Sequence, residues 1–88
     1  MDQYDVGVAA TPDQLRADEI AAGVSEGLLV VHMRKRTQAA WCKRCKGTVR
    51  TGSLGYHLIN TADGCYEAVY CRECWDMLRE RMPPDIQL

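Results

Sequence analysis

The chain has 88 residues, with 12 acidic and 11 basic side chains and a formal net charge of −1. This length allows one small domain, whose apolar core is often barely sufficient unless a metal or a second subunit adds stability. The longest purely apolar run, residues 28–31, is too short to span a bilayer, and no basic segment leads into a long apolar one at the start. We therefore expect a soluble, cytoplasmic protein without a membrane partner, whose cysteines stay reduced.

The charges are unevenly distributed along the chain. Residues 1–27 carry six acids against Arg16 alone. Residues 28–62 carry no acid and seven cations, namely Arg34, Lys35, Arg36, Lys43, Arg44, Lys46 and Arg50. A basic face of this kind suits a phosphate backbone or an acidic protein surface, such as an RNA polymerase component. The alternative is a solvated face that the acidic N-terminal part partly neutralises.

The N-terminal third predicts one helix. Residues 1–10 have no clear periodicity and are expected to form a loose arm or a short edge segment. Thr11 can cap the free amides of a following helix, Pro12 suits the first helical position, and Asp13 suits the positive end of the dipole. The helix is predicted from Pro12 to about Ala22, where Gly23 and then Gly27 end it.

An apolar segment, Leu-Leu-Val-Val-His-Met at residues 28–33, follows this helix. Its β-branched pair favours a strand over a second helix. The same segment is an alternative partner surface, including one for a homodimer. Residues 34–40 are expected to be a basic connector.

Two Cys-x-x-Cys pairs, Cys42/Cys45 and Cys71/Cys74, carry the strongest signal, with 25 residues between the inner cysteines. Each pair brings two thiolates toward one ion, and two pairs complete a tetrahedral site. The pattern predicts one structural zinc ion. The alternative is disulfides or unrelated thiols, against which the odd fifth cysteine argues. That residue, Cys65, is expected to pack in a hairpin, the alternatives being a ligand or a reactive thiol.

The region between and after the pairs predicts two turns, short strands and a helix. Gly47 is expected to take a positive φ beyond the first pair. Residues 48–51 and 56–60 are predicted to pair as strands across a turn at 52–55, and Asp63-Gly64 predicts a second turn before 65–70. A helix is predicted from Arg72 to Met82. Its apolar stripe consists of Trp75, Leu78 and Met82, and Pro83 ends it.

The chain resembles a treble-clef zinc finger over Trp41 to Met82. In this class a turn that carries the first cysteine pair, called the knuckle, is followed by a hairpin and by a helix that begins at the second cysteine pair. The Tyr-Cys-Arg-Glu-Cys entry at residues 70–74 is similar to the N-terminal zinc-binding domain of the ClpX unfoldase, which dimerises and docks adaptors. It is also similar to the anti-sigma zinc proteins of the Gin and Fin type, and residues 55–58 resemble a short stretch between the pairs in Gin. These resemblances imply that the four paired cysteines bind zinc and that the partner is a protein.

A treble-clef nuclease of the endonuclease VII type is a further alternative. Such enzymes need a His to activate water, with an Asp-His pair between the cysteine pairs and an Asn after the second. Here His57 follows Tyr56, and Trp75 stands where Asn is expected. We therefore expect no enzymatic activity. His57 is predicted to face solvent or its hairpin partner, and Trp41 and Trp75 to shield the zinc, with base stacking as their alternative role.

The sequence thus predicts a small α+β zinc-binding domain with an N-terminal helix. Its organisation is expected to be an arm, helix and apolar segment at 1–40, a treble-clef domain at 41–84 and a tail at 85–88. The expected function is a non-enzymatic binding module that regulates transcription or nucleic-acid processing through the basic face. The alternative is a protein-interaction module of the anti-sigma or Clp adaptor-docking kind.

Overall fold

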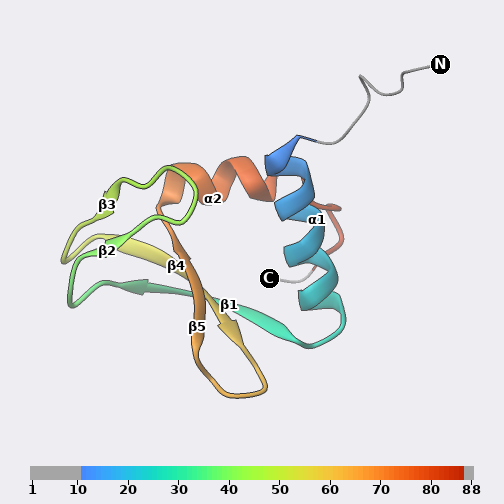
Figure 1. Cartoon of the computed structure of the whole chain (residues 1–88), viewed down its shortest axis with the longest axis horizontal. Helices are drawn as coiled ribbons and strands as arrows, with labels where there is room; N and C mark the ends of the chain where they lie inside the picture. Colours follow the sequence, from blue (N-terminus) through green and yellow to red (C-terminus); the bar gives the residue numbers. More distant parts are fainter. Residues whose placement is uncertain (1–10, 87–88) are drawn as a thin grey trace.

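The computed structural model describes residues 11–86, so the predicted N-terminal arm lies outside the described residues. It is a small α+β structure with two helices and two antiparallel sheets (Figure 1). In chain order the elements are α1 (Pro12–Ser25), β1 (Leu29–Lys35), β2 (Ala40–Trp41), β3 (Thr48–Val49), β4 (Leu54–Asn60), β5 (Tyr66–Tyr70) and α2 (Arg72–Arg79).

The larger sheet has the strand order β1-β4-β5, and all of its neighbours are antiparallel. Strand β1 pairs with β4 over its whole length, from Leu29 opposite Asn60 to Lys35 opposite Leu54. The apolar segment before the first cysteine pair is thus a strand, as expected. The prediction of a basic connector over residues 34–40 is wrong at both ends, because Arg34 and Lys35 belong to β1 and Ala40 begins β2. The turn at Asp63-Gly64 joins β4 to β5 as predicted, with Gly64 at φ 72°.

The predicted pairing of residues 48–51 with 56–60 is wrong. Strand β3 pairs with β2, with Trp41 opposite Thr48, and these two strands form a separate small sheet. Residues 50–53 do form a turn, closed by a hydrogen bond of 3.0 Å from the Ser53 amide to the Arg50 carbonyl. The strand that follows the turn pairs instead with β1, which offers a ladder of seven residues.

Helix α1 begins as predicted, because the Thr11 hydroxyl accepts a hydrogen bond of 3.1 Å from the Gln14 amide. It ends at Ser25 rather than near Ala22, so the prediction that Gly23 breaks it is wrong. Gly23 lies inside the helix, where a Cβ atom would come within 2.4 Å of Leu29 Cδ1. The glycine therefore allows α1 to pack closely on β1, and the chain turns at Gly27, whose φ is 76°.

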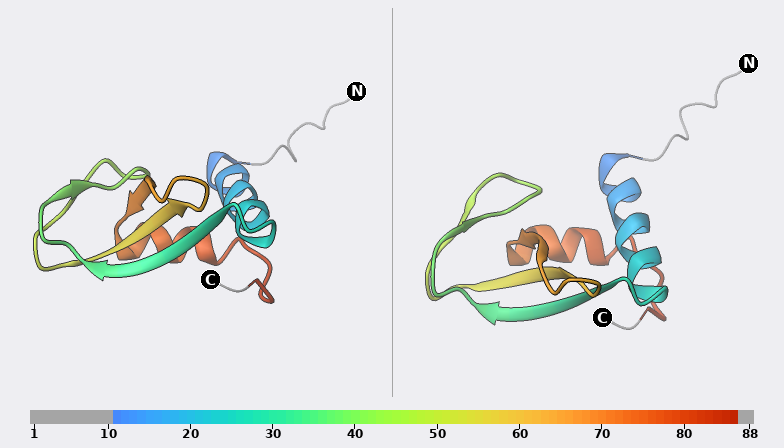
Figure 2. Two further views of the ribbon diagram at one scale, coloured as in Figure 1. Left: turned by 90° about the horizontal axis from the view of Figure 1, so that it is seen from below. Right: turned by 60° about the horizontal axis from the view of Figure 1, so that its bottom comes forward.

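Both helices cover one face of the larger sheet. Figure 2 shows α2 lying along this face and α1 crossing one end of the sheet, with the β2–β3 strands at the other end. The fully buried side chains between these layers include Ile20 of α1, Leu58 of β4, Tyr70 of β5 and Leu78 of α2. Trp75 of α2 is buried as well and stacks on Tyr56. The core therefore adjoins the first turn of α2.

Helix α2 ends at Arg79, three residues before the predicted end. The chain continues in tight turns, and Met82 is still buried together with Trp75 and Leu78. The predicted apolar stripe therefore faces the core. In the part of the chain that the structure describes, neither helix is long and apolar enough to cross a membrane.

Candidate metal centre

The four paired cysteines converge at one point. The Sγ atoms of Cys42, Cys45, Cys71 and Cys74 all lie within 4.8 Å of one another. A tetrahedral zinc ion with Zn–S bonds of about 2.3 Å separates its sulfurs by about 3.8 Å. The Cys45 and Cys71 sulfurs, one from each pair, are 3.9 Å apart, which is also far beyond a disulfide bond. The four side chains are thus positioned to bind one metal ion.

The first pair lies in the turn between β2 and β3. The Cys42 amide donates to the Gly47 carbonyl at 2.8 Å, and the Lys46 amide donates to the Cys42 carbonyl at 2.9 Å. Lys46, and not Gly47 as predicted, takes the positive φ, at 64°. Gly47 instead donates its amide to Cys45 Sγ at 3.3 Å, and a Cβ atom on Gly47 would come equally close to that sulfur. The absence of a side chain at Gly47 therefore lets its backbone amide approach the Cys45 sulfur closely.

The second pair lies at the start of α2. Cys71 is the N-cap residue and Cys74 is in the first turn, with its side chain buried. The free amides and the positive end of the helix dipole favour thiolates at this place. The Lys43 amide donates to the Val69 carbonyl at 2.9 Å, which joins the first pair to β5 two residues before Cys71. This backbone contact brings the two halves of the site together.

The thiol pKa values differ widely across the cluster. Burial favours a raised pKa at Cys42, but the amides of Cys45, Cys71 and Arg44 donate to its sulfur and hold its pKa at about 7. Burial raises the pKa of Cys74 to about 12 against the opposing hydrogen bond from Arg44, and burial also raises the pKa of Cys71. A bound dication supplies the charge that ionises all four sulfurs together, and a tetrahedral set of four thiolates is one that zinc favours.

Arg44, between the ligands of the first pair, joins the cluster to α1. Its Nη1 donates to Cys74 Sγ at 3.5 Å, while Nε and Nη2 donate to the two carboxylate oxygens of Asp13 at 2.8 and 2.7 Å. The hydrogen bond from Arg44 lowers the pKa of the Asp13 carboxyl. Sequence analysis placed Arg44 on the basic face and Asp13 in a helix start, and it missed their pairing across 31 residues.

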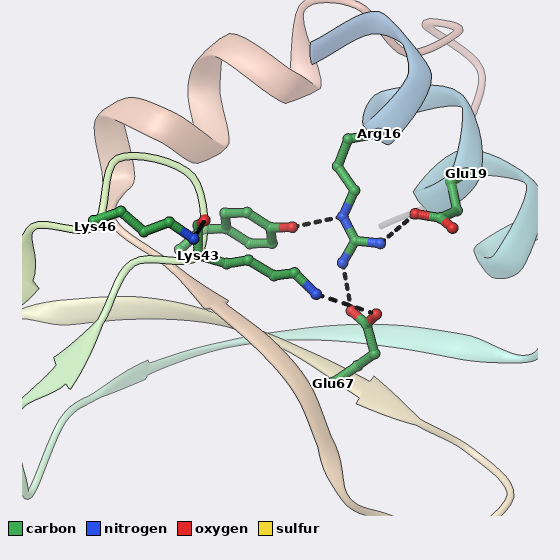
Figure 3. A network of polar contacts seen from close by, with 6 residues as sticks. Arg16, Glu19, Lys43, Lys46 and Glu67 are labelled. Carbon is green, nitrogen blue, oxygen red and sulfur yellow. Dashed lines mark hydrogen bonds and ion pairs between the residues drawn. The ribbon is translucent and has the colours of Figure 1, made fainter. Parts of the chain in front are cut away.

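Lys43 belongs to a second network, which Figure 3 shows. Arg16 of α1 donates to the Glu19 and Glu67 carboxylates and to the Tyr70 hydroxyl, and Lys43 approaches Glu67 at 3.8 Å. Lys46 is nearby and donates to the Lys43 carbonyl at 3.0 Å. Two predicted basic-face residues, Lys43 and Arg44, are therefore engaged by acids of this chain.

The segments that carry four further cations, residues 34–36 and 50, lie at the end of the larger sheet away from α1 (Figure 1). There the Arg36 amide donates to the Ser53 carbonyl at 2.9 Å, and Arg50 begins the same turn. We name Arg34, Lys35, Arg36 and Arg50 the basic end. Within residues 11–86, no ion pair joins any of these four to an acid. Arg36 bonds to neutral groups, the Gln38 carbonyl and the His57 ring, both at 2.9 Å.

Of the two placements predicted for His57, facing solvent is wrong, and its ring instead lies 4.9 Å from that of Tyr66 on the paired strand β5. Its side chain is 1% exposed, with Nδ1 at 3.3 Å from the His32 carbonyl and Nε2 at 2.9 Å from Arg36 Nη1. A neutral ring satisfies both contacts, since Nδ1–H donates and Nε2 accepts. Burial is the main cause of its lowered pKa, and the Arg36 and Arg34 charges add to it. His57, which the nuclease alternative needed to activate water, is thus buried, and both of its ring nitrogens already have hydrogen-bond partners.

Two other aromatic and thiol predictions need correction. Trp41 is 77% exposed, so it does not shield the cluster, whereas Trp75 is buried beside Cys74. Cys65 is exposed rather than packed in the hairpin, and it is not part of the four-sulfur cluster. Trp41 ends the two-residue strand β2 and Cys65 precedes β5, so the alternation of faces along a strand does not fix the direction of either side chain.

The fold and the cluster together define a small α+β protein with a four-cysteine metal-binding site. No protein-family model, no curated protein and no solved structure matches the chain.

Proposed function

We propose that the chain is a non-enzymatic binding module, stabilised by one structural zinc ion, that acts on nucleic acid in transcription or in nucleic-acid processing. The observation that carries this proposal is the basic end, whose four cations have no acid partner among the described residues. The cluster supports a structural role for the metal, because four protein ligands leave no open position for a substrate. The proposed treble-clef class is supported by the chain order, in which a turn with the first cysteine pair, the β4–β5 hairpin and a helix entered at the second pair follow one another.

The split among the cations supports a binding role for one part of the predicted basic face. Lys43 and Arg44 pair with acids of this chain, Glu67 and Asp13. Arg34, Lys35 and Arg50 are exposed, which leaves their charges available to phosphates. Counterion release from the nucleic acid would then supply most of the binding free energy, with a steep dependence on salt.

A protein partner is the second candidate, and β1 supports it. This strand is at an edge of its sheet, with Val30 and Met33 exposed on it and Leu28 exposed just before it. An unpaired edge with apolar side chains can accept a strand of another protein or of a second copy. Modules of the anti-sigma or adaptor-docking kind would use such a surface.

The test is a charge reversal at the basic end, with Arg34, Lys35 and Arg50 changed together to Glu. A matched control reverses Arg72 of α2, which is exposed, and is compared with each single reversal at the basic end. Both proteins should keep their zinc and fold, because exposed charges change stability by only about half a kcal/mol each. Binding to labelled DNA and RNA oligonucleotides is measured by anisotropy across a salt series.

We expect the basic-end variant to lose binding and the control to keep it. Single reversals should each lower the slope of log affinity against log salt by about one unit. Undiminished oligonucleotide binding by the folded basic-end variant would contradict the proposal. Absence of oligonucleotide binding in the native protein would shift the function to the edge of β1.

A further inference from the structure

The face of the larger sheet turned away from the helices carries a row of polar and aromatic side chains. Cross-strand neighbours in an antiparallel sheet share a face. Val30 is opposite Ile59, which is opposite Tyr66, and in the next row His32 is opposite His57. We name Val30, His32, Arg34, Ile59 and Tyr66 the outer sheet face.

A β-bulge brings Tyr66 to this face. The ladder between β4 and β5 shifts by one residue, with Leu58 opposite Ala68 but Ile59 opposite Tyr66. The extra residue is Glu67, which turns to the Arg16 and Lys43 network (Figure 3). Without the bulge, strict alternation from buried Ala68 would point Tyr66 toward the helices. The bulge thus serves two purposes, an internal ion pair and an outward aromatic ring.

The Tyr66 ring has a buried support behind it. Its centroid is 4.9 Å from that of His57, while the residue as a whole is 52% exposed. His57 is itself fixed by the His32 carbonyl and by Arg36. One side of the Tyr66 ring is therefore backed by an immobilised imidazole, and the rest is open to a ligand.

A shallow hollow of about 550 Å³ adjoins this ring, lined by His32, Arg34, Ile59, Gly64, Cys65 and Tyr66. Arg34 Nη2 lies 3.2 Å from His32 Nδ1, which keeps the guanidinium on the outer sheet face. No acid lines the hollow, and Asp63 in the adjacent turn accepts a hydrogen bond from the Cys65 amide at 3.0 Å. The hollow thus combines an aromatic ring, an apolar floor and a cation.

We propose that the outer sheet face binds single-stranded nucleic acid, with one base stacked on Tyr66 in the hollow and Arg34 on an adjacent phosphate. This proposal rests on the proposed nucleic-acid function and names its ligand class. A ring within a sheet face reaches the flat face of a base only when that base is unstacked, so a duplex does not fit. The basic end continues along the chain from Arg34 through Lys35 and Arg36. These cations would contact further phosphates of the bound nucleic-acid strand.

The test uses the zinc-loaded full chain and fluorescein-labelled oligothymidylate and oligouridylate of about ten nucleotides, a typical single-strand site size. A blunt-ended duplex of similar length is the competitor. Tyr66→Leu removes the ring and keeps apolar bulk, Tyr66→Phe keeps the ring, and Trp41→Leu removes an exposed ring outside the hollow.

We expect Tyr66→Leu to weaken single-strand binding about tenfold, the effect of losing one stacked base, without changing the salt slope. Tyr66→Phe and Trp41→Leu should bind like the native chain, and the duplex should compete poorly. Cys65 gives a readout that needs no variant, since a strand in the hollow should slow its alkylation.

The two proposals fail in different ways. If Tyr66→Leu binds like the native chain, or the strand leaves Cys65 alkylation unchanged, the outer sheet face is not the site, while loss of binding in the basic-end variant still supports the proposed function. Equal competition by the duplex also overturns the single-strand proposal alone. If neither strands nor duplex bind the native chain, the proposed function itself fails.

Discussion

Arg44 is the residue through which the cluster reaches the rest of the protein. One edge of its guanidinium donates to Cys74 Sγ and the other holds Asp13 with two hydrogen bonds. A charged donor to a ligand sulfur stabilises the thiolate, and partners of this kind affect metal affinity almost as strongly as the ligands. We therefore expect the metal and the position of α1 to depend on each other.

This coupling predicts the outcome of a double-mutant cycle with Asp13→Asn and Arg44→Met. Arg44→Met should lower zinc affinity about tenfold, because a ligand sulfur loses its donor. Each single change should lower the melting temperature, and the double change should cost less than their sum. Chelator competition measures the affinity and calorimetry the stability.

The exposed pair Arg72 and Asp76, at 3.9 Å, gives the matched control. Asp76→Asn should leave both quantities nearly unchanged, since surface pairs contribute little. Strictly additive effects of Asp13→Asn and Arg44→Met would contradict the coupling.

His57 makes the stability of the protein depend on pH in a way that the four cysteines of the cluster do not explain. Its pKa in the folded state is lowered from 6.5, so below that pH the unfolded chain binds the proton more tightly than the folded one. The free energy of unfolding therefore falls as the pH drops from about 6.5 toward the folded-state pKa.

His57→Phe keeps an aromatic ring and removes this titration. At pH 7.5 it should lower the free energy of unfolding by about 1 kcal/mol through the lost hydrogen bonds. This deficit should shrink as the pH falls below about 6.5, because only the native chain loses the His57 contribution. Urea unfolding of the zinc-loaded proteins measures this difference in the free energy of unfolding. The pH dependence that comes from the four cysteines is the same in both proteins and cancels in the comparison. A deficit that is constant or grows toward low pH would refute the assignment, and exposed His32→Phe is the control.

At the scale of elements, the contact between α1 and β1 depends on the missing side chain of Gly23. A Cβ atom there would meet Leu29 Cγ at 2.8 Å as well as Cδ1. In an ordinary helix interior, Ala is more stable than Gly by about 1 kcal/mol. Here the steric cost opposes that gain.

We predict that Gly23→Ala destabilises the protein by about 1–2 kcal/mol, as overpacked sites do. Combining it with Leu29→Ala should cost less than the sum of the two changes, because the second makes room for the first. Ser25→Ala, exposed in the same helix, is the control and should be near neutral. A raised melting temperature for Gly23→Ala would show that Leu29 moves aside at no cost.

The elements differ in how far the sequence predicts them. The start of α1, the β4–β5 turn and the first turn of α2 depend on neighbouring residues, and all were predicted. The pairing of β3 was not, because Thr48–Val49 pairs within the knuckle while β4 pairs with β1, which is 25 or so residues away in sequence. Local turn signals identify where a chain reverses but not which strand it then joins.

At the scale of the whole molecule, the metal-binding residues were predictable and the surfaces were not. Ligand type and spacing are local, so the two cysteine pairs indicated one cluster. The exposure of Tyr66 depends on a bulge, and the burial of His57 depends on Arg36 and β1, so neither follows from a local pattern. Among the seven cations of one acid-free stretch, two join internal ion pairs, Lys46 donates to a backbone carbonyl and four form the basic end, and this division appears only once the chain is folded.

The cluster joins the knuckle, β5 and α2, and Arg44 extends it to α1. Because a site of this kind forms only in the folded chain, the free energy of metal binding is also free energy of folding. Native mass spectrometry combined with circular dichroism tests this claim most directly. We predict one zinc ion per folded chain, lost together with the fold in Cys42→Ser and Cys74→Ser and retained in Cys65→Ser. A folded, metal-free native chain, or a Cys65→Ser variant that loses zinc as fully as Cys74→Ser, would contradict it.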